Sequence, residues 1–378
     1  MKYRYFDCAA TTRVDDEIAA IISKYNGSLF YNASANYAVA ASVHHEIDGA
    51  REGLLNALKG FNGTLYFVSS GTEGDNQALF CSKKRRNANI VISAAEHPAI
   101  YNTANALKNS GFELRICPVD SFARVNEAAF AELVDIDTAL VSVMHVNNET
   151  GGINDIKKLV SIAKRKSPAV IFHSDGVQAF GKVPANLSDL GVDLYTISGH
   201  KIGAPKGIAA LYVKKGISIA PLLYGGGQES GLRSSTENVS GIMSFAFAAK
   251  RAQGERQELE ERYRAFSNVL KDRLSEIEEI QYLSDEKCSA HIFTFAFKSV
   301  RGEVMQHALE SVGFLVGTGS ACSSTRAHER IPKALGLKEY SDGVIRISFG
   351  RENTMEEVQE LAAALVENYN VLKKYVGR

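Results

Sequence analysis

From about residue 64 the sequence alternates short runs of β-branched residues with longer polar segments whose apolar residues recur at helical spacing. This alternation is typical of a parallel sheet whose strands are joined by covering helices. It predicts an α/β fold, with a large domain built on a mainly parallel seven-stranded sheet flanked by helices. The predicted strands are Leu65–Val68, Ile90–Ser93, Leu114–Val119, Ala139–His145, Val170–Asp175, Leu194–Ser198 and Ala209–Val213.

The C-terminal part of the sequence has a different pattern. Residues 238–277 contain no proline, carry apolar residues at helical spacing and have a highly charged middle, which predicts one or two long helices. A smaller α+β domain is predicted beyond them, from two strand-like runs and an amphipathic helix: His291–Phe297, Val344–Phe349 and Met355–Tyr375. We therefore expect an N-terminal segment that packs on the domains (1–20), a large domain (21–240), and a connecting helix with the small domain (241–378).

Charge and cysteine content narrow the class of protein. The 43 basic and 43 acidic side chains give a formal net charge of zero, which argues against nucleic acid or anionic lipid as a partner. Five scattered cysteines without a C-x-x-C pair favour a reducing compartment. No secretory signal or membrane-spanning window is recognisable, and the pair His44-His45 lacks further ligands at metal-binding spacing. We expect a cytoplasmic protein without metal.

Polar residues follow nearly every predicted strand of the large domain. Ligands bind at the carboxyl ends of the strands in an open parallel sheet, so these residues are the candidates for function. Backbone N–H groups at the helix start after Ser69, with the Thr72 hydroxyl, would form an anion cradle suited to phosphate. An ordinary helix N-cap at Ser70 or Thr72 explains the same residues. The other candidates are Glu96, His97, Asn147, Asn148, Glu149, Asp175, Gln178, Ser198, Gly199, His200 and Lys201.

Two of these residues have charges that point to a particular cofactor chemistry. Lys201 follows a buried strand, where loss of solvation lowers the pKa of an amine and makes it a nucleophile toward an aldehyde cofactor. Asp175 ends the preceding predicted strand, where a carboxylate can keep a pyridinium nitrogen protonated. Taken one at a time, each residue has another explanation. Lys201 could be a lysine that buries its hydrocarbon stem and exposes its ammonium group, and Asp175 could be a helix cap. Their place beside the phosphate cradle, at one edge of one sheet, favours a pyridoxal phosphate site.

Nine segments in sequence order then carry a family resemblance: FDCAATT, SSGTEGDN, EHPAI, MHVNNETG, SDGVQAFGKVP, SGHKIGAPKG, GGGQESGLRSSTENV, GTGSACSS and IRISFGREN. Together they resemble the cysteine desulfurases, in the class V aminotransferase group of fold-type I pyridoxal-phosphate enzymes. The resemblance covers almost the whole chain. It implies pyridoxal 5'-phosphate as cofactor, L-cysteine as substrate and a homodimer.

The resemblance also implies a role for each matching position around the cofactor. Lys201 would form the Schiff base, Asp175 would bind the pyridine nitrogen, and Gln178 would bind the phenolic oxygen. His97 would stack on the ring and help to move protons. Thr236 would reach the phosphate of the neighbouring subunit. The phosphate ligands within the same chain would be Gly71, Thr72, Ser198 and His200.

The resemblance assigns the substrate to three further residues. Asn148 and Arg346 would hold the substrate carboxylate, and a guanidinium suits this task because it can donate two parallel hydrogen bonds. Cys322 would attack the substrate sulfur as a thiolate and carry it as a persulfide. The sequence departs from the family's usual pattern in places that leave Lys201, Asp175 and Cys322 unchanged. These departures are Cys8 for Asn, Tyr37 for His, Ser70 and Ser235 for Gly, and Gly74 for Ser.

The expected function is therefore that of a pyridoxal-phosphate-dependent cysteine desulfurase that releases L-alanine. The 24 residues from Cys322 to Arg346 resemble the long-loop subgroup, which hands sulfur to an acceptor protein for iron–sulfur cluster assembly or tRNA thiolation. A selenocysteine lyase, or another class V lyase or transaminase, is the alternative enzyme. A sulfur-carrying partner protein with little turnover of its own is the alternative of another class.

Overall fold

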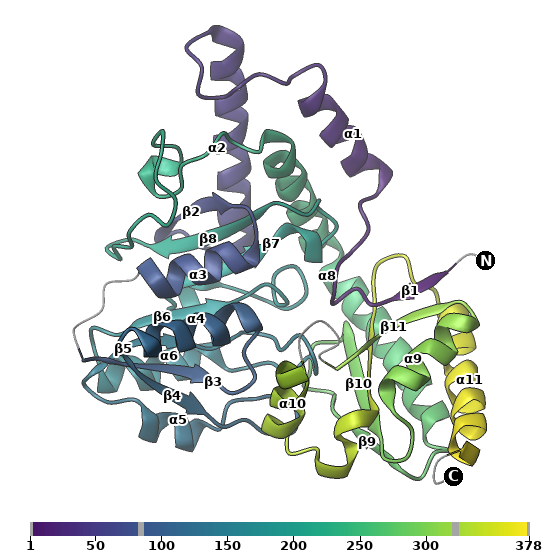
Figure 1. Cartoon of the computed structure of the whole chain (residues 1–378). Coiled ribbons are helices and arrows are strands. Elements are labelled where there is room, and N and C mark those ends of the chain that lie inside the picture. Colours follow the sequence, from purple (N-terminus) through teal and green to yellow (C-terminus); the bar gives the residue numbers. More distant parts are fainter. Residues whose placement is uncertain (1–2, 82–86, 320–324, 376–378) are drawn as a thin grey trace.

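Two β-sheets joined by one long helix make up the chain, shown as a computed structural model in Figure 1. The structure describes residues 3–81, 87–319 and 325–375. The larger sheet has the strand order β2-β8-β7-β6-β5-β3-β4, in which β8 runs antiparallel to both β2 and β7 and the other neighbouring strands are parallel. This result confirms the predicted seven-stranded, mainly parallel sheet. The strands are β2 (Gly63–Val68), β3 (Asn89–Ser93), β4 (Glu113–Cys117), β5 (Thr138–Ser142), β6 (Ile171–Asp175), β7 (Leu194–Ser198) and β8 (Ala209–Lys214).

Helices flank the large sheet because each connection between parallel strands crosses one of its faces. In α6 (Ile156–Lys166) the buried residues Ile156, Leu159, Val160 and Ala163 recur at helical spacing, so one face packs on the core. Asp155 caps its first turn by accepting a hydrogen bond from the backbone N–H of Lys158. The other helices of this part are α1 (Asp16–Asn26), α2 (Ala38–Leu58), α3 (Gly71–Cys81), α4 (Pro98–Asn109), α5 (Glu127–Leu133) and α7 (Leu187–Leu190).

The smaller sheet has the strand order β1-β11-β12-β10-β9, so its edge strand β1 comes from the N-terminus of the chain. β1 runs parallel to β11, and the other pairs are antiparallel. The strands are β1 (Arg4–Phe6), β9 (Ile280–Tyr282), β10 (Ile292–Phe297), β11 (Phe314–Thr318) and β12 (Val344–Ser348). The accompanying helices are α9 (Gly302–Ser311), α10 (Thr325–Ala334) and α11 (Met355–Leu372).

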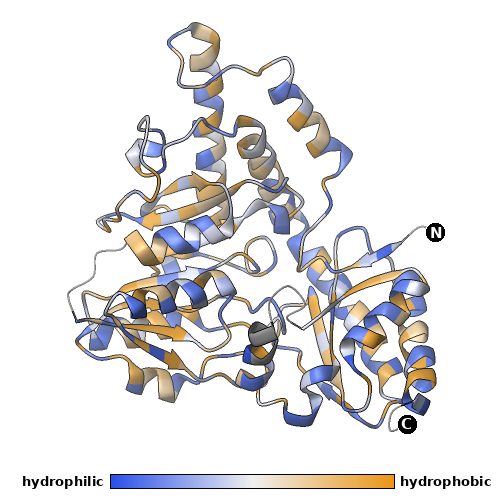
Figure 2. Cartoon of the chain, viewed as in Figure 1, coloured by the Kyte–Doolittle hydropathy of each residue, from blue (hydrophilic) through white to orange (hydrophobic). Residues whose placement is uncertain are grey.

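The long helix α8 (Val239–Leu274) is continuous and contributes to both hydrophobic cores. Ile242 and Phe245 pack in the core of the large sheet, whereas Phe266 and Leu270 pack in the core of the small sheet. The strands of both sheets are mainly hydrophobic, and the helices place hydrophilic residues outward (Figure 2). In the described part of the chain, none of the helices has the combination of length and apolar character needed to cross a bilayer.

Candidate active site

Lys201 lies in the short 3₁₀ helix Gly199–Lys201 that directly follows β7. Its Nζ atom donates hydrogen bonds to the backbone carbonyls of Ala9 and Ala10, at 2.6 and 2.8 Å. Burial lowers the pKa of this amine to about 8, with a further contribution from the positive charge of Arg346. Lys201 is therefore a partly desolvated amine, as its position after a buried strand predicts.

Asp175 is the last residue of β6, the strand next to β7 in the sheet, and Gln178 lies in the turn that follows it. Burial raises the pKa of the Asp175 carboxyl to about 6, against the opposing effects of a hydrogen bond from the backbone N–H of Val177 and the charge of Lys201. The Gln178 side chain donates to the carbonyl of Ala9 at 2.8 Å. Lys201 and Gln178 thus meet at one backbone carbonyl, beside a buried carboxylate.

Residues 9–12 form a backbone wall behind these side chains. The backbone N–H and the hydroxyl of Thr12 both donate to the carbonyl of His200 at 2.9 Å, and the Thr11 hydroxyl lies 3.2 Å from Nδ1 of His200. Burial, with the charges of Lys201 and Lys206, lowers the pKa of His200 to about 4. The wall therefore positions His200 as well as Lys201.

His97 comes from the loop after β3 and begins α4 as its N-cap. Its Nδ1 accepts a hydrogen bond from the backbone N–H of Ala99 at 3.1 Å. Burial, with the charges of Lys201 and Arg330, lowers the pKa of His97 to about 4. At neutral pH the ring is consequently uncharged, and its proton is on Nε2.

Gly71, the first residue of α3, lies beside Ser198, the last residue of β7. A Cβ atom at Gly71 would lie 3.7 Å from Cβ of Ser198 and 3.0 Å from a methyl of Val177, so a larger residue would crowd this corner. Ser70 caps α3 by accepting from the backbone N–H of Glu73 at 3.1 Å, which shows the N-cap expected from the sequence. Thr72 is exposed in the first turn of the same helix. The first turn of α3 is therefore capped by Ser70 and also presents the exposed Thr72.

Arg346, on β12 of the small sheet, reaches across to this edge and is 8% exposed. Its Nη1 donates to the carbonyl of Asn148 at 2.9 Å, and its Nη2 lies 2.8 Å from Oδ1 of Asp7. Glu149 lies 3.4 Å from Nη1, and its other carboxylate oxygen accepts from the side-chain amide of Asn148 at 2.7 Å. The two predicted carboxylate-binding residues are thus in direct contact.

One predicted site residue of the described chain, Thr236, is not brought to this cluster. Thr236 is exposed on the segment before α8, where its carbonyl accepts from the hydroxyl of Ser235. Cys322 lies outside the described residues. A third position, Gly74, departs from the family pattern for a visible reason: a Cβ there would lie 2.9 Å from the methyl of Thr196. The described residues contain no cluster of three or more metal-ligating side chains.

The sequence reasoning missed two residues of the cluster, His291 and Asp7, and named Glu149 as a candidate without its contact to Arg346. His291 holds Gln178 from the small sheet, with 3.2 Å between Nε2 and Oε1. Asp7 and Glu149 place two carboxylates on the guanidinium of Arg346. Glu149 and Asp7 do occur in the polar motifs quoted above, and His291 begins a predicted strand, but no spacing in the sequence connects them to their partners.

Comparison with known proteins agrees with this geometry. The family model for the class-V aminotransferases matches residues 4–361. A cysteine desulfurase IscS of Methanosarcina thermophila is 35% identical over 96% of this chain and 91% of that protein, and cysteine desulfurase IscS 1 of Archaeoglobus fulgidus is 34% identical over 96% and 95%. A solved NifS-like protein superposes with a TM-score of 0.91 at 31% identity, over 98% of this chain and all of that one.

A parallel sheet with a buried lysine and a buried aspartate at its carboxyl edge, joined to a smaller sheet that supplies an arginine, is the arrangement of a class-V aminotransferase, and the chain belongs to that family. The cofactor implied by this family is pyridoxal phosphate. Within the family, the chain belongs to the cysteine desulfurases, which confirms the resemblance seen in the sequence.

Proposed function

We propose that this enzyme takes sulfur from L-cysteine, releases L-alanine and carries the sulfur on Cys322. The observation that carries the proposal is the buried amine of Lys201, which shares a sheet edge with the buried carboxylate of Asp175. Arg346 reaches the same edge from the small sheet, where it contacts Asn148. Membership of the cysteine desulfurases supports the choice of substrate.

The residues present fit pyridoxal 5'-phosphate. Lys201 would bond to its aldehyde carbon, Asp175 would hold a proton on the pyridine nitrogen, and Gln178 would bind the phenolic oxygen. His97 would lie on the ring face. When bound, the cofactor delocalises the negative charge left on the substrate after its α-proton is removed. The phosphate would be held by Gly71, Thr72, Ser198 and His200, and by Thr236 of the partner subunit.

The residues of the chain would divide the work on the substrate. Arg346 binds the carboxylate of L-cysteine, and Asn148 orients that guanidinium through its carbonyl. Lys201, with a pKa of about 8, is poised to accept and return a proton near neutral pH. His97 keeps its Nδ1 occupied by Ala99, so Nε2 is the atom left to exchange protons.

Sulfur transfer would occur at Cys322. Its thiolate attacks the sulfur of L-cysteine, an S–S bond forms, and the Cβ–S bond of the substrate breaks. The electron pair of the broken bond stays with the carbon skeleton, which takes up a proton and leaves as L-alanine. The thiol of Cys322 and one L-cysteine thus become one persulfide and one L-alanine.

We further propose a homodimer, in which Thr236 completes the phosphate site of the partner subunit. The sulfur would pass to an acceptor protein for iron–sulfur cluster assembly or tRNA thiolation. The charge balance and scattered cysteines favour a cytoplasmic protein. We also propose that residues 1–20 pack on the domains, that residues 21–240 form the large domain, and that residues 241–378 form the connecting helix and the small domain.

The test compares wild type with Cys322→Ser, using Cys81→Ser as the matched control. The purified enzymes are incubated with L-cysteine and a thiol reductant, and alanine and sulfide are assayed together. We expect both products to fall at least about 100-fold in Cys322→Ser, because a serine hydroxyl cannot act as the attacking thiolate. Alanine release near the wild-type rate in Cys322→Ser would overturn the persulfide step. Retention of activity with selenocysteine alone would indicate a lyase.

A further inference from the structure

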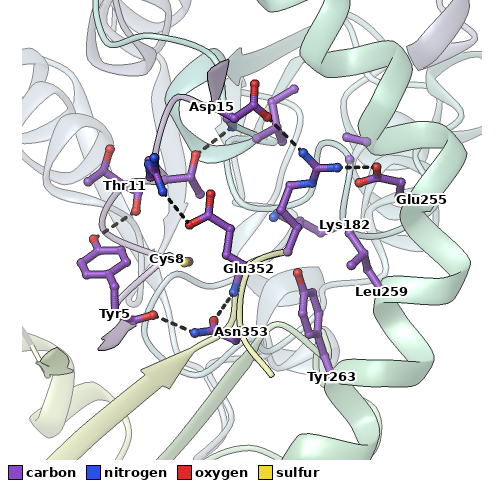
Figure 3. Close-up of a pocket in the computed structure, with 18 of the residues that line it drawn as sticks. Tyr5, Cys8, Thr11, Asp15, Lys182, Glu255, Leu259, Tyr263, Glu352 and Asn353 are labelled. Carbon is purple, nitrogen blue, oxygen red and sulfur yellow. Dashed lines mark hydrogen bonds and ion pairs between the residues drawn. The ribbon is translucent and has the colours of Figure 1, made fainter. Parts of the chain in front are cut away.

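A cavity of about 550 Å³ lies behind the backbone wall of residues 9–12, among β1, α8 and the turn after β12. Figure 3 shows Tyr5, Cys8 and Thr11 on one side of it, with Leu259 and Tyr263 of α8 opposite. None of the described residues predicted to bind cofactor or substrate lines this cavity. Its volume is in the range of small-molecule sites, and its position separates it from the active site.

The wall between the cavity and the active site is a single layer of chain. Cys8, Thr11 and Thr12 line the cavity. The same segment offers the carbonyls of Ala9 and Ala10 to Lys201 on its other side. A molecule in the cavity would therefore contact the segment that positions the active-site lysine.

Most of the charged side chains that line the cavity have an ion-pair partner, but among the described residues the partly buried Lys182 and the exposed Lys206 have none. Arg351 bridges Asp15 and Glu255, at 3.0 and 2.7 Å, and Arg251 also pairs with Asp15. Within the described part of the chain, Lys182 has no carboxylate partner, and burial lowers the pKa of its ammonium group. Lys182 is a partly buried amine that faces the cavity without a counterion.

The remaining surface beside Lys182 is largely hydrocarbon. Ile202 of the large-sheet core, with Leu259 and Tyr263 of α8, contributes apolar surface to the lining. The partly buried ammonium of Lys182 favours a negative charge on the ligand, because an anion beside it restores the charged form that burial disfavours, whereas the exposed Lys206 stays hydrated. The apolar surface favours a hydrocarbon or aromatic body.

We propose that this cavity binds a small organic acid, with its carboxylate on Lys182 and its apolar body against Leu259 and Tyr263. The bound acid would contact Cys8 and Thr11, and so would lie directly behind the segment that holds Lys201. Binding of the acid is independent of the desulfurase chemistry and is measured without turnover.

The sequence contains no tryptophan, so an indole probe can be measured without a protein background. Indole-3-acetate is dialysed to equilibrium against the purified holoenzyme, and its fluorescence is read in the protein-free compartment. The neutral isostere indole-3-acetamide is the matched control ligand. We expect saturable binding of one indole-3-acetate per chain, about tenfold or more tighter than the amide, from the charge-assisted hydrogen bond to Lys182. Equal binding of the two probes, or no saturable binding of the acid, would overturn the proposal.

Three variants locate the bound acid. Lys182→Met keeps the length of the side chain without its charge and should weaken indole-3-acetate binding about tenfold or more. Lys215→Met, in the exposed turn directly after β8, should bind like wild type. Ala252→Phe leaves Lys182 intact and fills the cavity from α8, so it should also lose indole-3-acetate binding. If Lys182→Met does not fold, Ala252→Phe still tests whether the acid binds in this cavity. Unchanged affinity in folded Lys182→Met or Ala252→Phe, or displacement of the probe by L-cysteine, would refute the site.

Discussion

The Nε2 atom of His291 lies 3.2 Å from Oε1 of Gln178, so the residue directly before β10 holds a residue of the large-sheet edge. Burial lowers the pKa of His291 well below its ordinary value, and the neutral ring carries one proton. Its Nδ1 faces the hydroxyl of Ser289 at 2.8 Å, and the Gln178 amide nitrogen donates to Ala9. Each end of the Gln178 amide therefore has one partner, which fixes the orientation of the group.

We expect His291→Phe to weaken cofactor retention, because it keeps an aromatic ring but leaves Oε1 of Gln178 without its donor. One neutral hydrogen bond contributes about 0.5–1.5 kcal/mol, so the dissociation constant of the cofactor should rise about 2- to 10-fold. Equilibrium dialysis with absorbance detection measures it. His307→Phe, an exposed histidine on α9, is the matched control and should not change it. Equal retention in both variants would show that His291 does not position Gln178.

Cofactor capture by the cofactor-free protein should follow the titration of Lys201. The neutral amine is the nucleophile, and its pKa lies near 8 instead of the ordinary 10.5. The capture rate should therefore rise about tenfold per pH unit below pH 8 and level off above it, whereas an ordinary lysine would show a rising rate up to about pH 10. Stopped-flow absorbance gives the profile. A continued rise beyond pH 9 would contradict the assignment.

Borohydride reduction identifies the lysine directly. The holoenzyme should retain the cofactor covalently on Lys201, as read by peptide mass. Lys201→Ala should lose this label, and Lys206→Ala, which alters an exposed lysine five residues away, should keep it. Labelling of another lysine in wild type would show that Lys201 is not the cofactor lysine.

Arg346→Lys should mainly raise KM for L-cysteine. The guanidinium already donates to the carbonyl of Asn148 and to Asp7, and a lysine ammonium cannot reproduce this fixed geometry. A charge-assisted hydrogen bond contributes about 1.5–3 kcal/mol, so KM should rise about 10- to 100-fold while kcat changes much less. Steady-state kinetics checks this, with the exposed Arg301→Lys as control. A collapse of kcat at constant KM would assign Arg346 a different role.

Thr236→Val tests the shared phosphate site. Thr236 is exposed within its own chain, as a residue that serves a partner subunit would be before assembly. Loss of one charge-assisted hydrogen bond should weaken cofactor retention about 10-fold or more, and Thr64→Val on the exposed face of β2 should not. Sedimentation of the wild type should show a dimer. A fully active monomer would refute the shared site.

The sequence predicted the large sheet well because its strands are buried and β-branched. The two edge strands of the small sheet could not be found in this way: β1 and β9 have three residues each, too few to show a periodic pattern. The predicted strand 139–145 extends past the end of β5 at Ser142, although Val143 and His145 still donate to carbonyls of the β6 strand. The one or two helices expected over 238–277 are a single helix, α8.

The candidate site was predictable wherever strand order alone brings residues together. Asp175 and Lys201 follow adjacent parallel strands, so the sheet itself places them at one edge. Contacts made by His291 and Asp7 depend on how the small sheet packs against the large one, over sequence separations of 113 and 339 residues. No local pattern encodes such contacts.

α8 packs in both cores as one uninterrupted helix. The number of residues between its two packed segments therefore sets the angle between the two sheets. Deleting one residue between Ala249 and Leu259 would turn every later side chain by about 100° and shift it by about 1.5 Å along the axis. Either Phe266 and Leu270 would leave the small-sheet core, or the small sheet would turn with the helix and carry Arg346 away from Asn148. Removing seven residues nearly restores the angle but shortens the helix by about 10 Å. The length of α8 thus determines the geometry of the active site, as do the residues that line the site.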